Sequence, residues 1–306
     1  MEDQFLQLKE SLLKTIVFYD MFDCPLTAYE VWTYCDARCS LGQALAAMDG
    51  LVQAERKGGF YFLRGREEIV ALRLANRAHA RRKFRRALLL ARLFKFIPWI
   101  RMIAIGNQMG ADNLRDESDI DFFIITDANR IWITRWFCAG LAKILKLRPK
   151  PDKRRDTICL SFYISAERLD ASGLMLAHDK CHDIYFVQWL ANLAVIYDRG
   201  SAYCEFMLAN SWISEFLPNW APSRPVPARD AGPGFSDFYR DIIDMLIGGA
   251  DQIVKRIQLR IMPEVLHRAM NIDTRTVVND KILKLYVNDR REEYRERYLR
   301  RLGDFV

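Results

Sequence analysis

The sequence lacks an apolar run long enough to cross a membrane. Its most apolar window, residues 87–105, is interrupted by Arg92, Lys95, Pro98 and Arg101, which the core of a bilayer would resist. The sequence also lacks a secretory signal peptide and an internal repeat. These absences argue against a membrane partner, a secreted protein and a repeat array.

The seven cysteines lack the spacing of a disulfide framework. Their number is odd and they are spread over a long chain, so we expect reduced thiols and a cytoplasmic location. Zinc-binding patterns are equally poor. Cys24, Cys35 and Cys39 do not form a usual zinc box, and His178 and His182, although four residues apart, have no evident third ligand.

Length and charge set broader limits. A chain of 306 residues predicts two or three domains, and 51% hydrophobic with 28% charged residues predicts folded cores. The net charge of +7 is compatible with a polyanionic partner but is too small to demonstrate one.

Residues 1–66 have the order of a winged-helix-like module. Apolar periodicity predicts a helix over 4–21, and capping boxes at Thr27–Glu30 and Ser40–Gln43 predict two more, the second reaching about Ala54. A Gly-Gly turn and an aromatic strand follow. The last of these helices carries no Lys or Arg, so a structural or protein-interaction role is favoured over DNA reading, which stays the alternative.

Residues 67–97 predict one long basic helix. Arginines and lysines recur along it, interspersed with leucines, and Pro98 ends it. Two interpretations remain open. The helix is either a linker with a solvated basic face or a phosphate-facing surface beside an active site.

The central stretch, residues 97–165, carries the strongest functional signal. A strand at 99–105 leads into Gly106-Asn107, and a second strand opens with Ser118-Asp119-Ile120-Asp121 and continues into the apolar residues 122–125. Asp119 and Asp121 are two residues apart, so a strand places both carboxylates on one face. Such a pair is stabilised by a hard divalent cation, and Mg²⁺ is the expected ion, with Mn²⁺ as the alternative.

This pattern resembles the signature of the nucleotidyltransferase superfamily typified by DNA polymerase β. In that family a small-residue turn is followed after about ten residues by Asp-x-Asp, and here Gly106-Asn107 precedes Asp119-Ile120-Asp121. The resemblance covers about 70 residues, and Asn107 stands where the family usually has Ser or Gly. It implies that Gly106, Asn107 and Ser118 contact the phosphates of a nucleotide, while Asp119 and Asp121 hold the metal ion.

The resemblance also implies a third carboxylate on a later strand, which acts as general base. A helix is expected over 130–147 and a third strand over 156–164, and Asp156 at its start is the candidate. In the competing interpretation Asp156 only begins the strand, Ser161 takes the catalytic position, and the site lacks one acid.

The remaining chain predicts helices over 174–197, 203–217, 235–269 and 275–302, with a Pro-rich linker at 218–234. The expected fold class is α/β (α+β). A small mixed-sheet nucleotidyltransferase core (98–217) would be flanked by the winged-helix-like module (1–66), the linking helix (67–97) and a C-terminal helical region (235–306).

The leading functional prediction is a Mg²⁺-dependent nucleotidyltransferase that moves a nucleotidyl group from an NTP to a hydroxyl acceptor. The acceptor is a nucleic acid, a protein or a small molecule. The alternative is a catalytically degenerate regulatory protein that binds a nucleotide or a nucleic acid, and scaffolding through the terminal elements is compatible with either.

Overall fold

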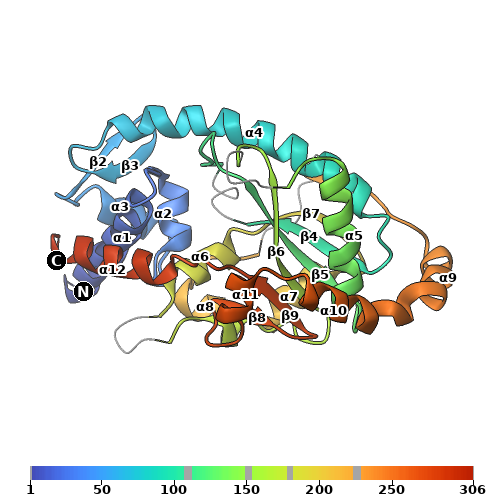
Figure 1. Cartoon of the computed structure of the whole chain (residues 1–306). Helices are drawn as coiled ribbons and strands as arrows, with labels where there is room; N and C mark the ends of the chain where they lie inside the picture. The colour runs from blue at the N-terminus through green and yellow to red at the C-terminus, as the bar shows by residue number, and fades with distance from the viewer. Residues whose placement is uncertain (1, 107–111, 149–153, 178–181, 223–228, 306) are drawn as a thin grey trace.

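The chain forms a mixed α/β fold with two separate sheets, which confirms the fold class predicted from the sequence (Figure 1). The computed structural model describes residues 2–106, 112–148, 154–177, 182–222 and 229–305. Within these residues the larger sheet has six strands in the order β7-β4-β5-β6-β9-β8, and the smaller sheet has three in the order β1-β3-β2.

The N-terminal segment contains three helices and the small antiparallel sheet. Its elements are α1 (Glu2–Asp20), β1 (Leu26–Thr27), α2 (Ala28–Tyr34), α3 (Leu41–Met48), β2 (Ala54–Lys57) and β3 (Phe60–Leu63). Both predicted capping boxes are present, at the starts of α2 and α3. The helix predicted to reach about Ala54 ends instead at Met48, because Ala54 begins β2 and pairs with Leu63. Gly58 and Gly59 both have positive φ in the turn between β2 and β3.

The long helix α4 (Glu68–Phe94) confirms the helix predicted over 67–96 and connects the small sheet to the large one (Figure 1). Its buried stripe includes Ala87, Ala91 and Phe94, which pack into the core of the large sheet. The opposite side of α4 is exposed and rich in arginine.

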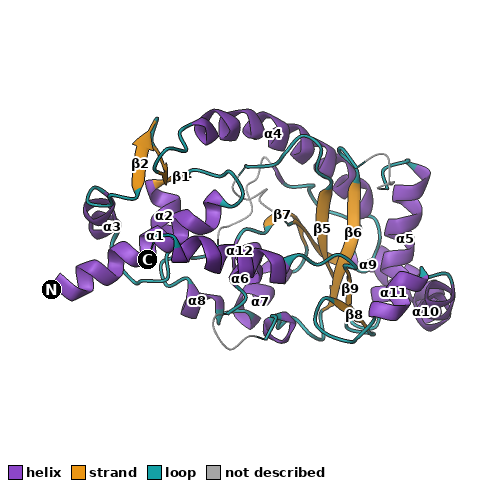
Figure 2. Ribbon diagram, turned by 60° about the vertical axis from the view of Figure 1, so that its left-hand side comes forward, coloured by secondary structure: helices purple, strands orange, loops and turns teal. Residues whose placement is uncertain are grey.

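The large sheet is mixed. It consists of β4 (Ile100–Ile105), β5 (Ile120–Thr126), β6 (Ile158–Ser165), β7 (Ala194–Asp198), β8 (Thr276–Val278) and β9 (Ile282–Leu285). Strands β5 and β6 are parallel and are joined through α5 (Ile131–Ile144), whereas β4 runs antiparallel to both β5 and β7. Figure 2 shows β5 and β6 side by side, with α5 beside them.

The two faces of this sheet are covered by different helices. Along β5, Phe122 and Ile124 pack with residues of α4 and α5, whereas Phe123 and Ile125 pack with residues of α6 and α7 on the other face. The helices that follow β6 are α6 (Ile184–Ala191), α7 (Ala202–Ala209) and α8 (Ile213–Phe216), after a short 3₁₀ turn at Ser172–Leu174. Because side chains alternate along a strand, Asp121 shares the face of Phe123.

The helix expected over 203–217 is divided into two and the helix expected over 235–269 into three, while two other predicted helices are partly replaced by strands. Among the described residues of the range 174–197, the expected α-helix covers only Ile184–Ala191, and residues 194–198 form the edge strand β7. The helix expected over 275–302 is replaced by strands β8 and β9 followed by α12 (Arg291–Gly303). In both cases a short apolar run is compatible with either periodicity, and pairing with a neighbouring strand decides the outcome.

The region expected to be a separate set of C-terminal helices is instead part of the main body. Helices α9 (Asp237–Ile247), α10 (Asp251–Arg260) and α11 (Glu264–Ala269) lead to β8 and β9, and β9 pairs with β6. Helix α10 packs on α5, where the Asp251 carboxylate accepts a hydrogen bond from the Ile133 amide at 2.9 Å. Residues 223–228 of the predicted Pro-rich linker lie outside the described residues, and Ala231 after them is buried.

Candidate functional site

The candidate site lies where β5 and β6 begin, side by side. Asp121 is paired with Cys159 in the parallel register, one step after Ile120 and Ile158. The register then shifts by one residue, because a bulge on β6 sets Phe162 rather than Ser161 opposite Phe123. The direct pairing places Cys159 on the same face as Asp121, and the bulge that follows returns Phe162 to that face.

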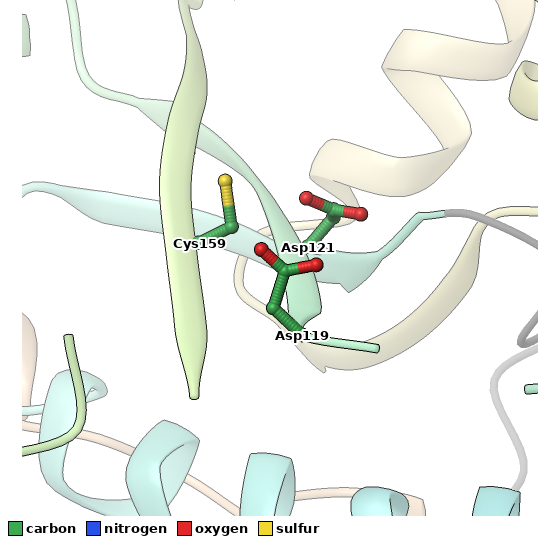
Figure 3. A group of neighbouring side chains, drawn as sticks. All are labelled: Asp119, Asp121 and Cys159. Carbon is green, nitrogen blue, oxygen red and sulfur yellow. The ribbon is translucent and has the colours of Figure 1, made fainter. Parts of the chain in front are cut away.

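Asp119, Asp121 and Cys159 form one compact cluster (Figure 3). One carboxylate oxygen of each aspartate and the Cys159 sulfur all lie within 4.8 Å of one another. Within the described residues this is the only group of three or more His, Cys, Asp or Glu side chains with that geometry. The structure therefore brings together the two predicted metal ligands and adds a thiol that the sequence analysis did not select.

The electrostatics of the cluster favour a bound cation. Asp121 is 9% exposed, and burial together with the negative charge of Asp119 raises the pKa of Asp121 to about 7. Burial also raises the pKa of Asp119, and burial next to Asp121 raises the pKa of the Cys159 thiol well above its usual range. Keeping two neighbouring, partly buried carboxylates ionised costs free energy, because they lose hydration and repel each other. A divalent cation between them would offset both effects.

The donor set decides which cations fit. Two carboxylates are the ligands that Mg²⁺ and Mn²⁺ prefer, so Asp119 and Asp121 suit the expected ion. The sulfur of Cys159 is a softer donor, which Mg²⁺ does not favour.

A cavity of about 160 Å³ opens beside the cluster, with Asp121 in its wall. Half of its lining residues are aromatic, and the lining comes from β5, β6, α6, β9 and the segment around the start of α12. The aromatic residues are Phe162, Tyr185, Phe186, Trp189, Tyr286 and Tyr294. A flat, partly apolar ligand would match such a lining.

The charged side chains around this cavity are paired with one another. The Lys284 ammonium lies 2.7 Å from the Asp289 carboxylate, and the Arg291 guanidinium lies 2.9 Å from Asp289 and 2.8 Å from Asp183. Burial lowers the pKa of Lys284 to about 8, although Asp289 opposes the shift. These ion pairs fix the walls of the cavity but leave little unbalanced charge inside it.

Asp156, the predicted third carboxylate, is not part of the cluster. It lies just before β6 with a φ of +60°, and its carboxylate lies 3.1 Å from Arg82, 3.2 Å from Lys83 and 3.3 Å from Arg86 of α4. Burial opposes ionisation, but the hydrogen bonds from Arg82 and Lys83 hold the pKa of Asp156 below its usual value. A carboxylate held as an anion by three cations is a poor proton acceptor.

Ser161, the competing candidate, lies closer to the cluster than Asp156 does. Its hydroxyl is 3.0 Å from the Cys159 sulfur. The side chain opposite Asp121 on β6 is thus a thiol, with the hydroxyl of Ser161 next to it.

The three residues predicted to contact phosphates have different outcomes. The Gly106 amide donates a hydrogen bond to the Asp121 carbonyl at 2.9 Å, and a Cβ at Gly106 would lie 2.6 Å from the Trp189 ring. Ser118 donates its hydroxyl to the Arg115 carbonyl at 2.9 Å, and its own carbonyl accepts from Lys83. Asn107 lies outside the described residues.

Neither weak zinc pattern gains support. His178 and Cys181 lie outside the described residues, and the His182 ring packs on Phe216 with 4.3 Å between ring centroids. Cys24 contacts Arg73, while Cys35 and Cys39 contact Asn219.

Cys159, Lys83 and the aromatic cavity were not predicted from the sequence as parts of the site. Cys159 stands in the apolar-polar-apolar run Ile158-Cys159-Leu160, which mirrors Ile120-Asp121-Phe122 on the neighbouring strand. The similarity of these two short runs is the feature of the sequence that could have indicated that Cys159 lies beside Asp121.

Comparisons with known proteins add no assignment. No protein-family model matches the chain, and neither the curated proteins nor the solved structures include a significant match. Within the described residues, every helix is too short or too polar to cross a bilayer.

Proposed function

We propose that the chain is a nucleotidyltransferase that depends on a divalent metal ion and moves a nucleotidyl group from an NTP to a hydroxyl acceptor. The observation that carries the proposal is the Asp119–Asp121–Cys159 cluster at the edge of an aromatic cavity. The resemblance of Gly106-Asn107 and Asp119-Ile120-Asp121 to the polymerase β signature supports the same reaction.

In this proposal, Asp119 and Asp121 hold Mg²⁺ or Mn²⁺. When bound, the ion neutralises charge on the phosphates and on the departing pyrophosphate. The two aspartates are positioned by β5, a strand with no exposed residue, so their geometry is set before a nucleotide arrives.

The cations of α4 and the loop before β6 supply positive charge on the side of Asp119. Lys83 and Arg154 are close enough to Asp119 to oppose the rise in its pKa. Asp156 fixes Arg82, Lys83 and Arg86 in place and is therefore proposed as a positioning residue. On the other side, the aromatic cavity next to Asp121 is suited to the base of a nucleotide.

A second function, binding of nucleotide without transfer, is favoured by one observation. The position opposite Asp121 holds the thiol of Cys159 rather than a carboxylate, and Asp156 is bound to three cations. A site with two acids can bind a nucleotide with its metal ion and still lack a side chain that takes the proton of an acceptor.

One experiment separates the two functions. The protein is incubated with α-³²P-labelled NTPs, Mg²⁺ or Mn²⁺ and mixed RNA, DNA and protein acceptors, next to Asp119→Asn and Asp121→Asn. Asp304→Asn, which changes an exposed acid far from β5, is the matched control.

Label transferred by the native protein and the control, but not by the two variants, supports the transferase. Binding of nucleotide with metal and no transfer supports the binding protein. If neither nucleotide nor metal binds, both proposals fail.

A further inference from the structure

Helix α4 carries an arginine stripe that the proposed reaction does not use. Arg77, Arg81 and Arg85 are exposed and follow one another at intervals of four residues, so they line one side of the helix over about 12 Å. No carboxylate within the described part of the chain lies within 4.0 Å of any of the three, and none of them makes a hydrogen bond there. We call these residues the arginine stripe.

This stripe departs from the way the other surface helices place their charges. Lys14 pairs with Glu10, Arg268 with Glu264 and Arg290 with Glu293, each three or four residues away. In α4, Glu68 is the only acidic residue of the whole helix. Like charges at four-residue spacing repel one another, so the stripe opposes helix formation, and a bound polyanion would relieve that repulsion.

The positive surface continues from the stripe towards the candidate site. Arg82 and Arg86 lie on the adjacent side of α4 and reach Asp156, and Arg155 reaches Asp116 at 3.0 Å. Arg154 acts on Asp119 itself. In Figures 1 and 2, α4 runs along the outer edge of the molecule, from the small sheet to the large one.

The residues between the arginines indicate the chemistry of the partner. From Arg77 to Arg86 no large apolar side chain is exposed, because Phe84 is buried and the other residues are Ala, His, Arg and Lys. A membrane-binding helix needs apolar side chains among its cations, and on α4 these occur only outside this segment, at Leu72, Leu74, Leu89 and Leu93. Arginine forks in a segment with no exposed apolar side chain between them match the phosphates of a nucleic acid.

We propose that the arginine stripe binds the sugar–phosphate backbone of a nucleic acid, and that this nucleic acid is the acceptor presented to Asp119 and Asp121. The second part rests on the proposed transfer function. The binding itself does not, because the stripe lies outside the cluster.

The test compares two triple variants of equal charge. Arg77→Ala, Arg81→Ala and Arg85→Ala together remove the stripe, with Ala chosen because it keeps the helix. Arg256→Ala, Arg260→Ala and Arg300→Ala remove three exposed arginines from α10 and α12 and form the matched control. Circular dichroism confirms that both variants are folded.

Binding of fluorescent single-stranded and duplex RNA and DNA is followed by anisotropy between about 50 and 200 mM salt, the range in which phosphate contacts weaken strongly. For the stripe variant we expect the slope of log K against log salt to fall in magnitude by about 2 for single strands and about 3 for duplexes. The control should keep the slope of the native protein.

Three outcomes overturn the inference: no binding of nucleic acid by the native protein, an equal loss in both triple variants, or stripe-dependent binding only to phosphatidylcholine vesicles that contain phosphatidylserine. Transfer is scored separately. If the stripe variant still labels nucleic acid as the native protein does, the stripe does not present the acceptor, and that part of the inference fails while the transferase stands. If Asp119→Asn binds nucleic acid normally but transfers nothing, and the stripe variant loses both binding and labelling of nucleic acid, both parts hold.

Discussion

Cys159 lies opposite Asp121 across the parallel strands β5 and β6, with its sulfur within 4.8 Å of a carboxylate oxygen. The two side chains come from segments separated by α5 and belong to one potential ligand set. A thiol in that set changes which ions the site should prefer, because sulfur is a soft donor.

We therefore expect the site to bind Mn²⁺ more tightly than Mg²⁺, and to bind Cd²⁺ or Co²⁺ with a sulfur-to-metal charge-transfer absorption. The absorption should disappear in Cys159→Ser and persist in Cys204→Ser, which changes an exposed thiol elsewhere. Metal titration followed by ultraviolet absorption measures this. An unchanged absorption in Cys159→Ser would remove Cys159 from the ligand set.

The raised pKa of Asp121 predicts that, without metal, the folded protein becomes less stable as the pH rises. This is the reverse of the effect of a carboxylate whose pKa is lowered in the fold. The pKa of Asp121 is about 7 in the fold against an ordinary value of 3.8, so the folded state binds more protons than the unfolded state between these values. Stability should consequently fall as the pH rises from about 4 to about 7. Asp121→Asn should remove this fall and be more stable than the native protein at pH 8 by up to a few kcal/mol, because each tenfold change in proton affinity is worth about 1.4 kcal/mol.

Thermal unfolding in EDTA at pH 5 and pH 8 checks this prediction, and added Mn²⁺ should raise the melting temperature of the native protein alone. A native protein that is equally stable at both pH values, with Asp121→Asn showing the same profile, would contradict the burial argument.

Asp156→Asn should destabilise the fold by about 2–3 kcal/mol. The Lys83 side chain is fully buried and would lose its carboxylate partner, whereas Arg82 and Arg86 reach solvent and lose less. Urea unfolding measures the loss, and Lys83→Met in the Asp156→Asn background should recover part of it. If Asp156 only positions these cations, transfer at saturating nucleotide should be reduced rather than abolished, while complete loss in a folded variant would restore Asp156 as the general base.

Gly106→Ala should destabilise by about 1–3 kcal/mol, because its Cβ would lie 2.6 Å from the Trp189 ring and the ring must move. Trp189→Phe makes room, so the same substitution should cost less in that background. Gly140→Ala is the matched control, since nothing lies within 4 Å of its Cβ and alanine favours its helix. Denaturant midpoints of Gly106→Ala, Trp189→Phe, the double variant and Gly140→Ala test this. If Gly106→Ala lowers stability equally with Trp189 and with Phe at position 189, a contact other than the Trp189 ring excludes the alanine Cβ.

Local signals in the sequence predicted much of this architecture. The capping boxes of Thr27 and Ser40 act within four residues, and both are formed as expected. The long apolar and basic periodicity of α4 likewise predicted one helix. Asp119 and Asp121 lie together because they occupy alternate positions near the start of one strand, which needs no knowledge of the rest of the fold.

Features that depend on distant pairing could not be obtained in this way. Residues 276–285 were expected to be helical, yet they form the hairpin of β8 and β9 because β9 finds β6 as a partner. The role of Cys159 depends on the register between β5 and β6, two strands that are separated in sequence by α5. Asp156 was expected at the metal because of its place in the sequence, and its left-handed backbone turns it instead towards α4.

Tyr298 of α12 belongs to the same buried core as Leu12 and Val17 of α1, and Arg301 pairs with Asp20, which is 281 residues away in sequence. During synthesis α1 leaves the ribosome long before α12 has been made. The apolar surface of α1 that contacts α12 therefore stays uncovered until α12 packs on it. A chain cut short before Tyr298 would therefore leave part of the apolar surface of α1 exposed.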